Sequence, residues 1–239
     1  GSEYAQISLG KSASEAGLFL LYFFIGFVVA AQIGGRMLDR AGAKRPVVLG
    51  CAAAAVGFYL WAEKVTQLSF HSQQWYIILA GAGMGMMLGP ASTDAVNRAS
   101  RLSYGEATGI TQTVRNYAAS LGLAILGTIL VSQFRSHLTT SFEKLGLPAG
   151  QAGSKAATFA QQSHGGGGSS RSIPHFVQLD FAYATRSVLL GMALVMAVAA
   201  VVGLFGLERG LQADPAATAD PGAIGADPSP RQEQEPAEA

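Results

Sequence analysis

Five apolar stretches, each long enough to cross a bilayer as a helix, constrain the fold of this chain more than any other feature of its sequence. They occupy residues 16–35, 46–62, 75–93, 116–134 and 187–207. The hydrocarbon core of a bilayer is about 30 Å thick, and a helix of about 20 residues crosses it. Because lipid offers the backbone no hydrogen bonds, apolar spanning segments of this length are helical. We therefore predict an all-α membrane protein with five transmembrane helices, four of them in residues 16–134.

The composition agrees with a membrane protein and argues against an enzyme. Charged residues make up 13% of the chain, compared with about a quarter in soluble domains. The single cysteine excludes an internal disulfide framework. The four histidines, which all fall in predicted outer loops without metal-ligand spacing, are His71, His137, His164 and His175. We predict no catalytic residues, no metal site and no cofactor. The basic residues are not interleaved with aromatic ones, so we also predict no nucleic-acid binding.

The distribution of lysine and arginine predicts the orientation of the chain, because short cytoplasmic loops are enriched in both. The loop between the first two stretches holds four basic residues, and the loop between the third and fourth holds Arg98 and Arg101. The loop 66–74 has none. We therefore place residues 1–15 in an outer loop and 208–239, rich in proline, alanine and acids, in a disordered cytoplasmic tail. The chain would then be a multi-pass protein of the plasma (inner) membrane.

The segment 135–186 is far longer than the other connections, and we predict a long extracellular loop there. Its residues 165–170 form a glycine and serine tract that behaves as flexible coil. Toward its end, four apolar residues would share one face of a helix lying in the outer interface. They are Ile173, Phe176, Val177 and Phe181.

The segment 35–46, in the first basic loop, has residues that suit a tight connection between two helices. Gly35 lets two helices approach, Gly42 permits a turn, and Pro46 suits the first turn of the next helix. Asp39 can accept hydrogen bonds from the amino terminus of that helix, where the dipole favours an anion.

The same segment resembles the loop motif of the major facilitator superfamily, Gly-x-Leu-Ala-Asp-Arg-x-Gly-Arg-Lys. In that family the loop latches the cytoplasmic side shut in the outward-facing state. The resemblance implies a latch with Asp39 and Arg40 as its pair, and the residues of the motif are Gly35, Asp39, Arg40, Gly42 and Lys44. Ala43 departs from the family, which usually has a base at that position. The alternative is a loop that only sets orientation and supplies one helix cap.

Glycines recur at every fourth residue of the third stretch, at Gly81, Gly85 and Gly89. Small residues at this spacing form a smooth ridge on which another membrane helix packs closely. Pro90 follows and loosens the helix. Helix packing is a better interpretation than a dinucleotide-binding fingerprint, because no strand precedes these glycines.

Gln112, Asn116 and Ser120 stand four residues apart and form one polar stripe on an otherwise apolar helix. Polar groups at this depth are costly unless they face water or a partner. Two interpretations remain open. The stripe lines a translocation path, or it forms hydrogen bonds that hold helices together.

Two charged residues, Asp94 and Arg115, lie closest to the membrane interior. Asp94 stands four residues before Arg98 on one helix, so a local ion pair is the simpler interpretation. The other hypothesis has Asp94 and Arg115 facing each other across two helices as an inner gate.

The run 105–128 looks like the corresponding span of the fourteen-helix drug:proton antiporters within the superfamily. It carries Gly105, Gly109, Gln112, Thr113, Arg115, Asn116, Ser120, Leu121, Gly122, Ala124, Gly127 and Thr128. With the loop motif, the resemblance covers about residues 4–207. It implies the last five of fourteen helices, which form most of the carboxyl-terminal bundle. The implied activity is secondary active transport by alternating access, with efflux of hydrophobic, often cationic compounds in exchange for protons.

This resemblance also implies the partners of the chain. They are the lipid bilayer, a small drug-like substrate, protons and missing amino-terminal helices of the same protein. The proton-binding carboxylate of the family usually lies in that missing half, so this fragment alone is not expected to transport. Two alternatives remain: a major facilitator uptake carrier for a metabolite, and a non-transporting membrane scaffold.

Overall fold

The computed structural model describes residues 2–9, 12–98, 104–164, 174–208 and 210, and this part of the chain is helical with short connections and no strand. In chain order the elements are α1 (Ser2–Ile7), α2 (Ala13–Ala41), α3 (Lys44–Lys64), the 3₁₀ turn η1 (Val65–Gln67), α4 (Phe70–Asn97), α5 (Tyr104–Lys144), α6 (Ala149–His164) and α7 (His175–Gly206). Within the described residues, α2, α3, α4, α5 and α7 are long and apolar enough to cross a membrane. The prediction of an all-α membrane protein with five spanning helices is confirmed.

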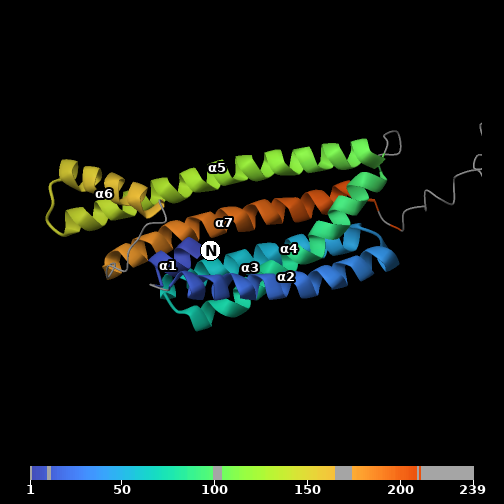
Figure 1. Cartoon of the computed structure of the whole chain (residues 1–239), viewed down its shortest axis with the longest axis horizontal. Helices are drawn as coiled ribbons and strands as arrows, with labels where there is room; N and C mark the ends of the chain where they lie inside the picture. Colours follow the sequence, from blue (N-terminus) through green and yellow to red (C-terminus); the bar gives the residue numbers. More distant parts are fainter. Residues whose placement is uncertain (1, 10–11, 99–103, 165–173, 209, 211–239) are drawn as a thin grey trace, which may run out of the picture.

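The spanning helices run back and forth along one common direction (Figure 1). α2, α3, α4 and α7 pack as a group, and α5 lies along the α7 side of that group. α1 and α6 lie at one end of the bundle. The α2–α3 connection, the start of α5 and the end of α7 lie at the opposite end. The basic connections therefore collect at one end of the bundle.

Glycines allow α4 to pack closely against two neighbouring helices. A Cβ atom at Gly81 or Gly85 would clash with the backbone carbonyl groups of Phe23 and Phe27 on α2. Gly83 lies on another face of α4, against the backbone of Ala54 on α3. Such close approach is typical of membrane helices, where small residues bring backbones together. α4 is thereby held between α2 and α3.

α5 and α7 continue well past the predicted spans, which corrects the expectation of a long loop over residues 135–186. α5 has 41 residues and is therefore about 60 Å long at 1.5 Å per residue, roughly twice the hydrocarbon core. Its last turns pack on the first turns of α7 through two edge-to-face aromatic pairs. These pairs are Phe134–Phe181, with ring centroids 5.0 Å apart, and Phe142–Phe176, at 5.8 Å.

The helix expected in the outer interface is therefore the beginning of α7, and its apolar face is turned toward α5. Val177 and Phe181 are each 1% exposed. Apolar side chains can be buried against a second helix as well as against lipid, and sequence periodicity alone does not distinguish the two. Ile173, the glycine and serine tract 165–170 and the tail from 211 onward lie outside the described residues.

A buried polar cluster fixes α1 to the rest of the bundle. The Tyr4 hydroxyl donates a hydrogen bond to the Val65 carbonyl at 2.6 Å and accepts one from Gln73 Nε2 at 2.9 Å. Gln73 Oε1 in turn accepts a hydrogen bond from Trp61 Nε1 at 3.1 Å. Each of the three side chains thus has a hydrogen-bond partner, as buried polar groups require. The expected outer loop 1–15 consequently begins with an ordered helix.

Candidate functional site

The loop motif lies at the turn between α2 and α3. Gly42 ends α2 with φ 76°, and its backbone N–H donates to the Leu38 carbonyl at 2.9 Å. That φ favours glycine, which explains why the turn needs Gly42. Pro46 occupies the first turn of α3, where its missing N–H costs nothing.

Two details of this motif differ from the sequence expectation. The amino-terminal cap of α3 is Ala43, and the cap has no side-chain hydrogen bond, so Asp39 does not cap that helix. Asp39 stays on the last turns of α2 and is exposed. The second difference concerns the close helix contact, which Gly34 makes in place of Gly35. A Cβ at Gly34 would clash with the Met86 carbonyl of α4, whereas Gly35 has open space around its Cβ position. Successive residues point 100° apart on a helix, so Gly34 faces α4 and the adjacent Gly35 does not.

The basic members of the motif lie beside one another. Arg40 at the end of α2 and Lys44 and Arg45 at the start of α3 line one side of a cavity that also touches α7. Arg40 and Arg45 are exposed. This geometry gives the turn a concentrated positive charge, and the α3 dipole adds to that charge.

The polar stripe of α5 is fully exposed in this chain. Gln112, Asn116 and Ser120 all face away from the other described helices, and Gln112 Nε2 approaches Asn116 Oδ1 at 3.5 Å. A Cβ added at Gly109 or Gly127, on the same helix, would meet no described atom within 4 Å. α5 contacts mainly α7 and α6, and only slightly α4. Most of the polar and small residues of α5 therefore have no neighbour among the described residues.

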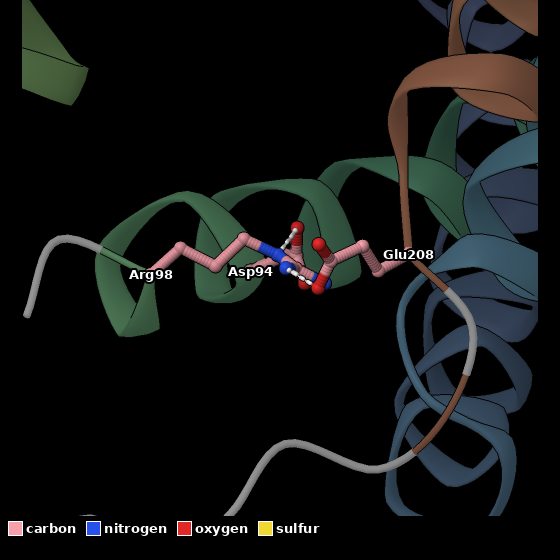
Figure 2. A network of polar contacts seen from close by, with 3 residues as sticks. All are labelled: Asp94, Arg98 and Glu208. Carbon is pink, nitrogen blue, oxygen red and sulfur yellow. Dashed lines mark hydrogen bonds and ion pairs between the residues drawn. The ribbon is translucent and has the colours of Figure 1, made fainter.

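Asp94 and Arg98 form the local ion pair that the simpler interpretation anticipated. Arg98 Nε donates to Asp94 Oδ2 at 2.9 Å, and Arg98 Nη1 donates to Glu208 Oε2 at 2.6 Å. Figure 2 shows Arg98 between the two carboxylates, which come from α4 and from the segment just after α7. Arg115 lies exposed on α5 and forms no ion pair with any described residue. The expected gate between Asp94 and Arg115 is therefore not formed in this structure.

Of the three glycines predicted to form a packing ridge on α4, two lie in a helix contact and one does not. Gly81 and Gly85 lie in the α2–α4 contact, whereas Gly89 faces open space. Pro90 is buried inside α4, which continues to Asn97. The glycine ridge that contacts α2 is thus two glycines long, Gly81 and Gly85.

Sequence reasoning missed Glu208 and Gln73. Glu208 falls in the segment 208–239 predicted to be a disordered tail, and no local pattern in the sequence indicates its pairing with Arg98. Gln73 falls in the segment 66–74 predicted to be a loop, yet it belongs to α4 and is 0% exposed. Among the described residues no group of histidines, cysteines or acids is arranged to hold a metal ion.

Comparison with known families agrees with this geometry. The family profile described as the Major Facilitator Superfamily matches residues 2–142, more than half of the chain. This chain belongs to the Major Facilitator Superfamily. Members of this superfamily are transporters rather than enzymes. The match covers the α2–α3 turn, the glycine contact of α4 and the polar face of α5.

Several curated relatives within the superfamily are named as transporters or resistance proteins. A triacylglyceride transporter of Mycolicibacterium smegmatis is 28% identical over 63% of this chain and 28% of its own length. The quinolone resistance protein NorB of Staphylococcus aureus is 25% identical over 62% of this chain and 33% of its own length. The multidrug transporter protein MdtP of Bacillus subtilis is 27% identical over 68% and 29%, respectively. The chain thus spans about a third of the length of the relatives it matches.

Proposed function

We propose that this chain is the carboxyl-terminal portion of a secondary transporter that exports hydrophobic, often cationic drug-like compounds in exchange for protons by alternating access. The observation that carries the proposal is the exposed polar stripe of α5, formed by Gln112, Asn116 and Ser120. In a bilayer such groups are costly unless they face water or a partner. Substrate sites of transporters of this kind lie near the bilayer midplane between two bundles. The names of NorB and MdtP support drug export.

The proposal includes further helices of the same protein on the exposed side of α5. This side is rich in glycine, threonine and serine, a composition that suits close contact with another membrane helix. The whole transporter would have fourteen helices, with its proton-binding carboxylate outside this chain.

The orientation and the latch form part of the same proposal. The α2–α3 turn would lie in the cytoplasm, because it holds Arg36, Arg40, Lys44 and Arg45. α1 and α6 would then lie outside a plasma (inner) membrane, and Asp39 with Arg40 would hold the cytoplasmic side shut. The exposed positions of Asp39 and Arg40 leave both side chains accessible to such partners.

The test is ethidium efflux by the intact protein, with the Asn116→Leu and Gln112→Leu variants. If the stripe lines the path, each variant lowers the initial efflux rate at least about tenfold, a change of about 1.4 kcal/mol in barrier, at unchanged protein level. A protonophore abolishes efflux by the unaltered protein. Thr111→Val is the matched control, because Thr111 lies on another face of α5 and its hydroxyl bonds to the Ala107 carbonyl of its own helix.

The other interpretations give different results. A metabolite uptake carrier raises rather than lowers cellular accumulation of its substrate. A non-transporting scaffold gives no ethidium efflux above that of cells without the protein. A stripe that only holds helices together retains full efflux when Gln112, Asn116 and Ser120 all become leucine in a protein that still folds. The name of the mycobacterial relative adds lipid as a second cargo class, which is measured with a fluorescent triacylglyceride in the same cells.

A further inference from the structure

A cavity opens at the basic end of the bundle, between the α2–α3 turn and the last turns of α7. Its volume is about 730 Å³. Arg40, Lys44 and Arg45 line it at the end of the bundle, and Val48, Leu49 and Leu204 supply apolar lining. Residues four apart share a helix face, so Val48 and Leu49 follow Lys44 and Arg45 along α3. The cavity therefore has a cationic side, formed by the three basic residues, and an apolar side, formed by Val48, Leu49 and Leu204.

The positive charge in this cavity is not compensated by the described residues. No acidic residue of the described part of the chain lines it, and none of the three cations forms an ion pair with a described carboxylate. Glu208, the acid that follows α7, is paired with Arg98. The backbone N–H groups at the start of α3 also lack a side-chain cap, so the helix dipole adds to the field of the cations. An anion would satisfy these groups together.

The apolar side of the cavity belongs to two membrane-spanning helices. Leu49 on α3 is 53% exposed and Leu204 on α7 is 48% exposed. Leu49 lies about one and a half turns into α3 and Leu204 about half a turn before the end of α7, so both belong to helices long and apolar enough to span a membrane. A free phosphate or a nucleotide would leave this apolar surface unused.

The shape of the cavity is held by a backbone contact. A Cβ at Gly42 would clash with the Gly210 carbonyl, so the turn and the segment after α7 touch directly. Gly210 also lines the cavity. This contact places the α2–α3 turn, beside which the cations lie, directly against Gly210 beyond α7.

We propose that this cavity binds an anionic phospholipid, with its phosphate at Arg40, Lys44 and Arg45 and an acyl chain along Leu49 and Leu204. Basic pockets between helices on the cytoplasmic side are suited to such headgroups. The inference rests on the proposed cytoplasmic location of the α2–α3 turn. The bound lipid would join the turn to α7 beside the proposed latch.

The competing occupant is the acidic segment 211–239 of this chain, which carries six acids. Carboxylates could neutralise the cations, but they do not account for an apolar side of the cavity that continues into the spanning helices. The lipid matches both sides, and we therefore favour it over the tail.

The test is native mass spectrometry of the purified intact protein, titrated with phosphatidylglycerol or with phosphatidylcholine of the same acyl chains. We expect phosphatidylglycerol to be retained in preference. Arg45→Gln should weaken its binding about fivefold, and Arg40, Lys44 and Arg45 all changed to glutamine on the order of a hundredfold, since each basic residue near a membrane surface contributes a similar amount. Arg45→Lys keeps the charge and should retain most of the binding.

The matched control is Arg36→Gln, which removes the same charge from an exposed position of α2 outside the cavity and should leave binding unchanged. Equal retention of the two lipids, or equal losses in Arg36→Gln and Arg45→Gln, overturns the proposal. Displacement of the lipid by millimolar inorganic phosphate points to a free-anion site and also overturns it. If preference for phosphatidylglycerol appears only after residues 211–239 are deleted, the tail is the occupant. Lipid retention is measured without transport, so failure of ethidium efflux leaves this result intact.

Discussion

Arg98, which follows α4 directly, binds Glu208, the second residue beyond α7, through a hydrogen bond of 2.6 Å from Nη1 to Oε2. The same guanidinium donates from Nε to Asp94, and the pairing with the two carboxylates raises the pKa of Arg98 further. The side chain of Glu208 is 81% exposed and that of Asp94 10%. The two ion pairs of one arginine therefore lie in very different surroundings.

This difference predicts unequal effects of two substitutions on thermal unfolding of the purified protein. Asp94→Asn should destabilise by about 1–3 kcal/mol, because it removes a charged hydrogen-bond acceptor from a largely buried position. Glu208→Gln should cost less than about 1 kcal/mol, as exposed pairs do, and its effect should shrink in high salt. Glu143→Gln, an exposed acid of α5 without an ion pair among the described residues, is the control. Equal losses from Asp94→Asn and Glu208→Gln would contradict this assignment.

The glycine contact between α2 and α4 predicts a position-dependent response to added side-chain volume. Gly85→Val should abolish or severely reduce the yield of folded protein, because even its Cβ would clash with the Phe27 carbonyl and backbones cannot separate without loss of packing. Gly89→Ala, four residues further on the same helix, should be neutral or slightly stabilising, since it meets open space and alanine favours helix. Fluorescence-detected gel filtration measures both. Similar profiles for the two variants would show that the α2–α4 contact is not this close.

The spanning helices could be predicted from sequence because long apolar runs admit few other structures in lipid. The turn at Gly42 was also predictable, since its φ of 76° favours glycine. Which of two adjacent glycines touches a neighbour was not, because Gly34 and Gly35 point 100° apart and the rotation of α2 depends on tertiary packing. The predicted cap of α3 by Asp39 was wrong, because Asp39 belongs to the last turns of α2 and the cap position of α3 is Ala43.

The helical structure of the outer parts of α5 and α7 could not be predicted from their composition. Residues after Phe134 are polar on one side of α5 and were assigned to a loop, although the other side packs on α7 through Phe142. Each helix is stabilised by the other, and such mutual support has no local sequence signal. The pairing of Arg98 with Glu208 joins residues that are 110 apart in the chain, and it too depends on the fold.

The buried hydroxyl of Tyr4 predicts a pH-dependent stability. Burial raises the pKa of Tyr4 to about 12, although the hydrogen bond from Gln73 opposes this shift. The folded protein therefore keeps this proton where the unfolded chain, with a pKa of about 10, loses it. The stability associated with the protonated Tyr4 is complete below pH 10 and is lost as the pH rises toward 12.

Tyr4→Phe tests this dependence by thermal unfolding at two pH values. At pH 8 the variant should be less stable by about 1 kcal/mol, because it loses the hydrogen bond to the Val65 carbonyl. Above pH 10 this difference in stability should narrow. Only the unaltered protein has a phenol at residue 4, and its ionisation in the unfolded chain favours unfolding. Tyr59→Phe, at an exposed position of α3, should show no such change. A constant difference between Tyr4→Phe and the unaltered protein from pH 8 to pH 11.5 would contradict the predicted titration.

The environment of Asp180 on α7 predicts that removing its charge stabilises the folded protein. The residue is 8% exposed, and its Oδ2 has no hydrogen-bond partner among the described residues. Its contacts on α5 are a hydrogen bond with Ser141 and the charges of His137 and Lys144. Burying a carboxylate is costly unless its oxygens are satisfied.

Asp180→Asn keeps the shape and an acceptor for Ser141 while removing the charge, so we expect stabilisation by about 1 kcal/mol at neutral pH. Asp180→Ala lacks the acceptor and leaves a cavity, and it should be less stable than Asp180→Asn. Thermal unfolding of the two variants decides the matter. A loss of stability in Asp180→Asn would mean that attraction to Lys144 outweighs the cost of burial, and would make this carboxylate a stabilising link between the outer parts of α5 and α7.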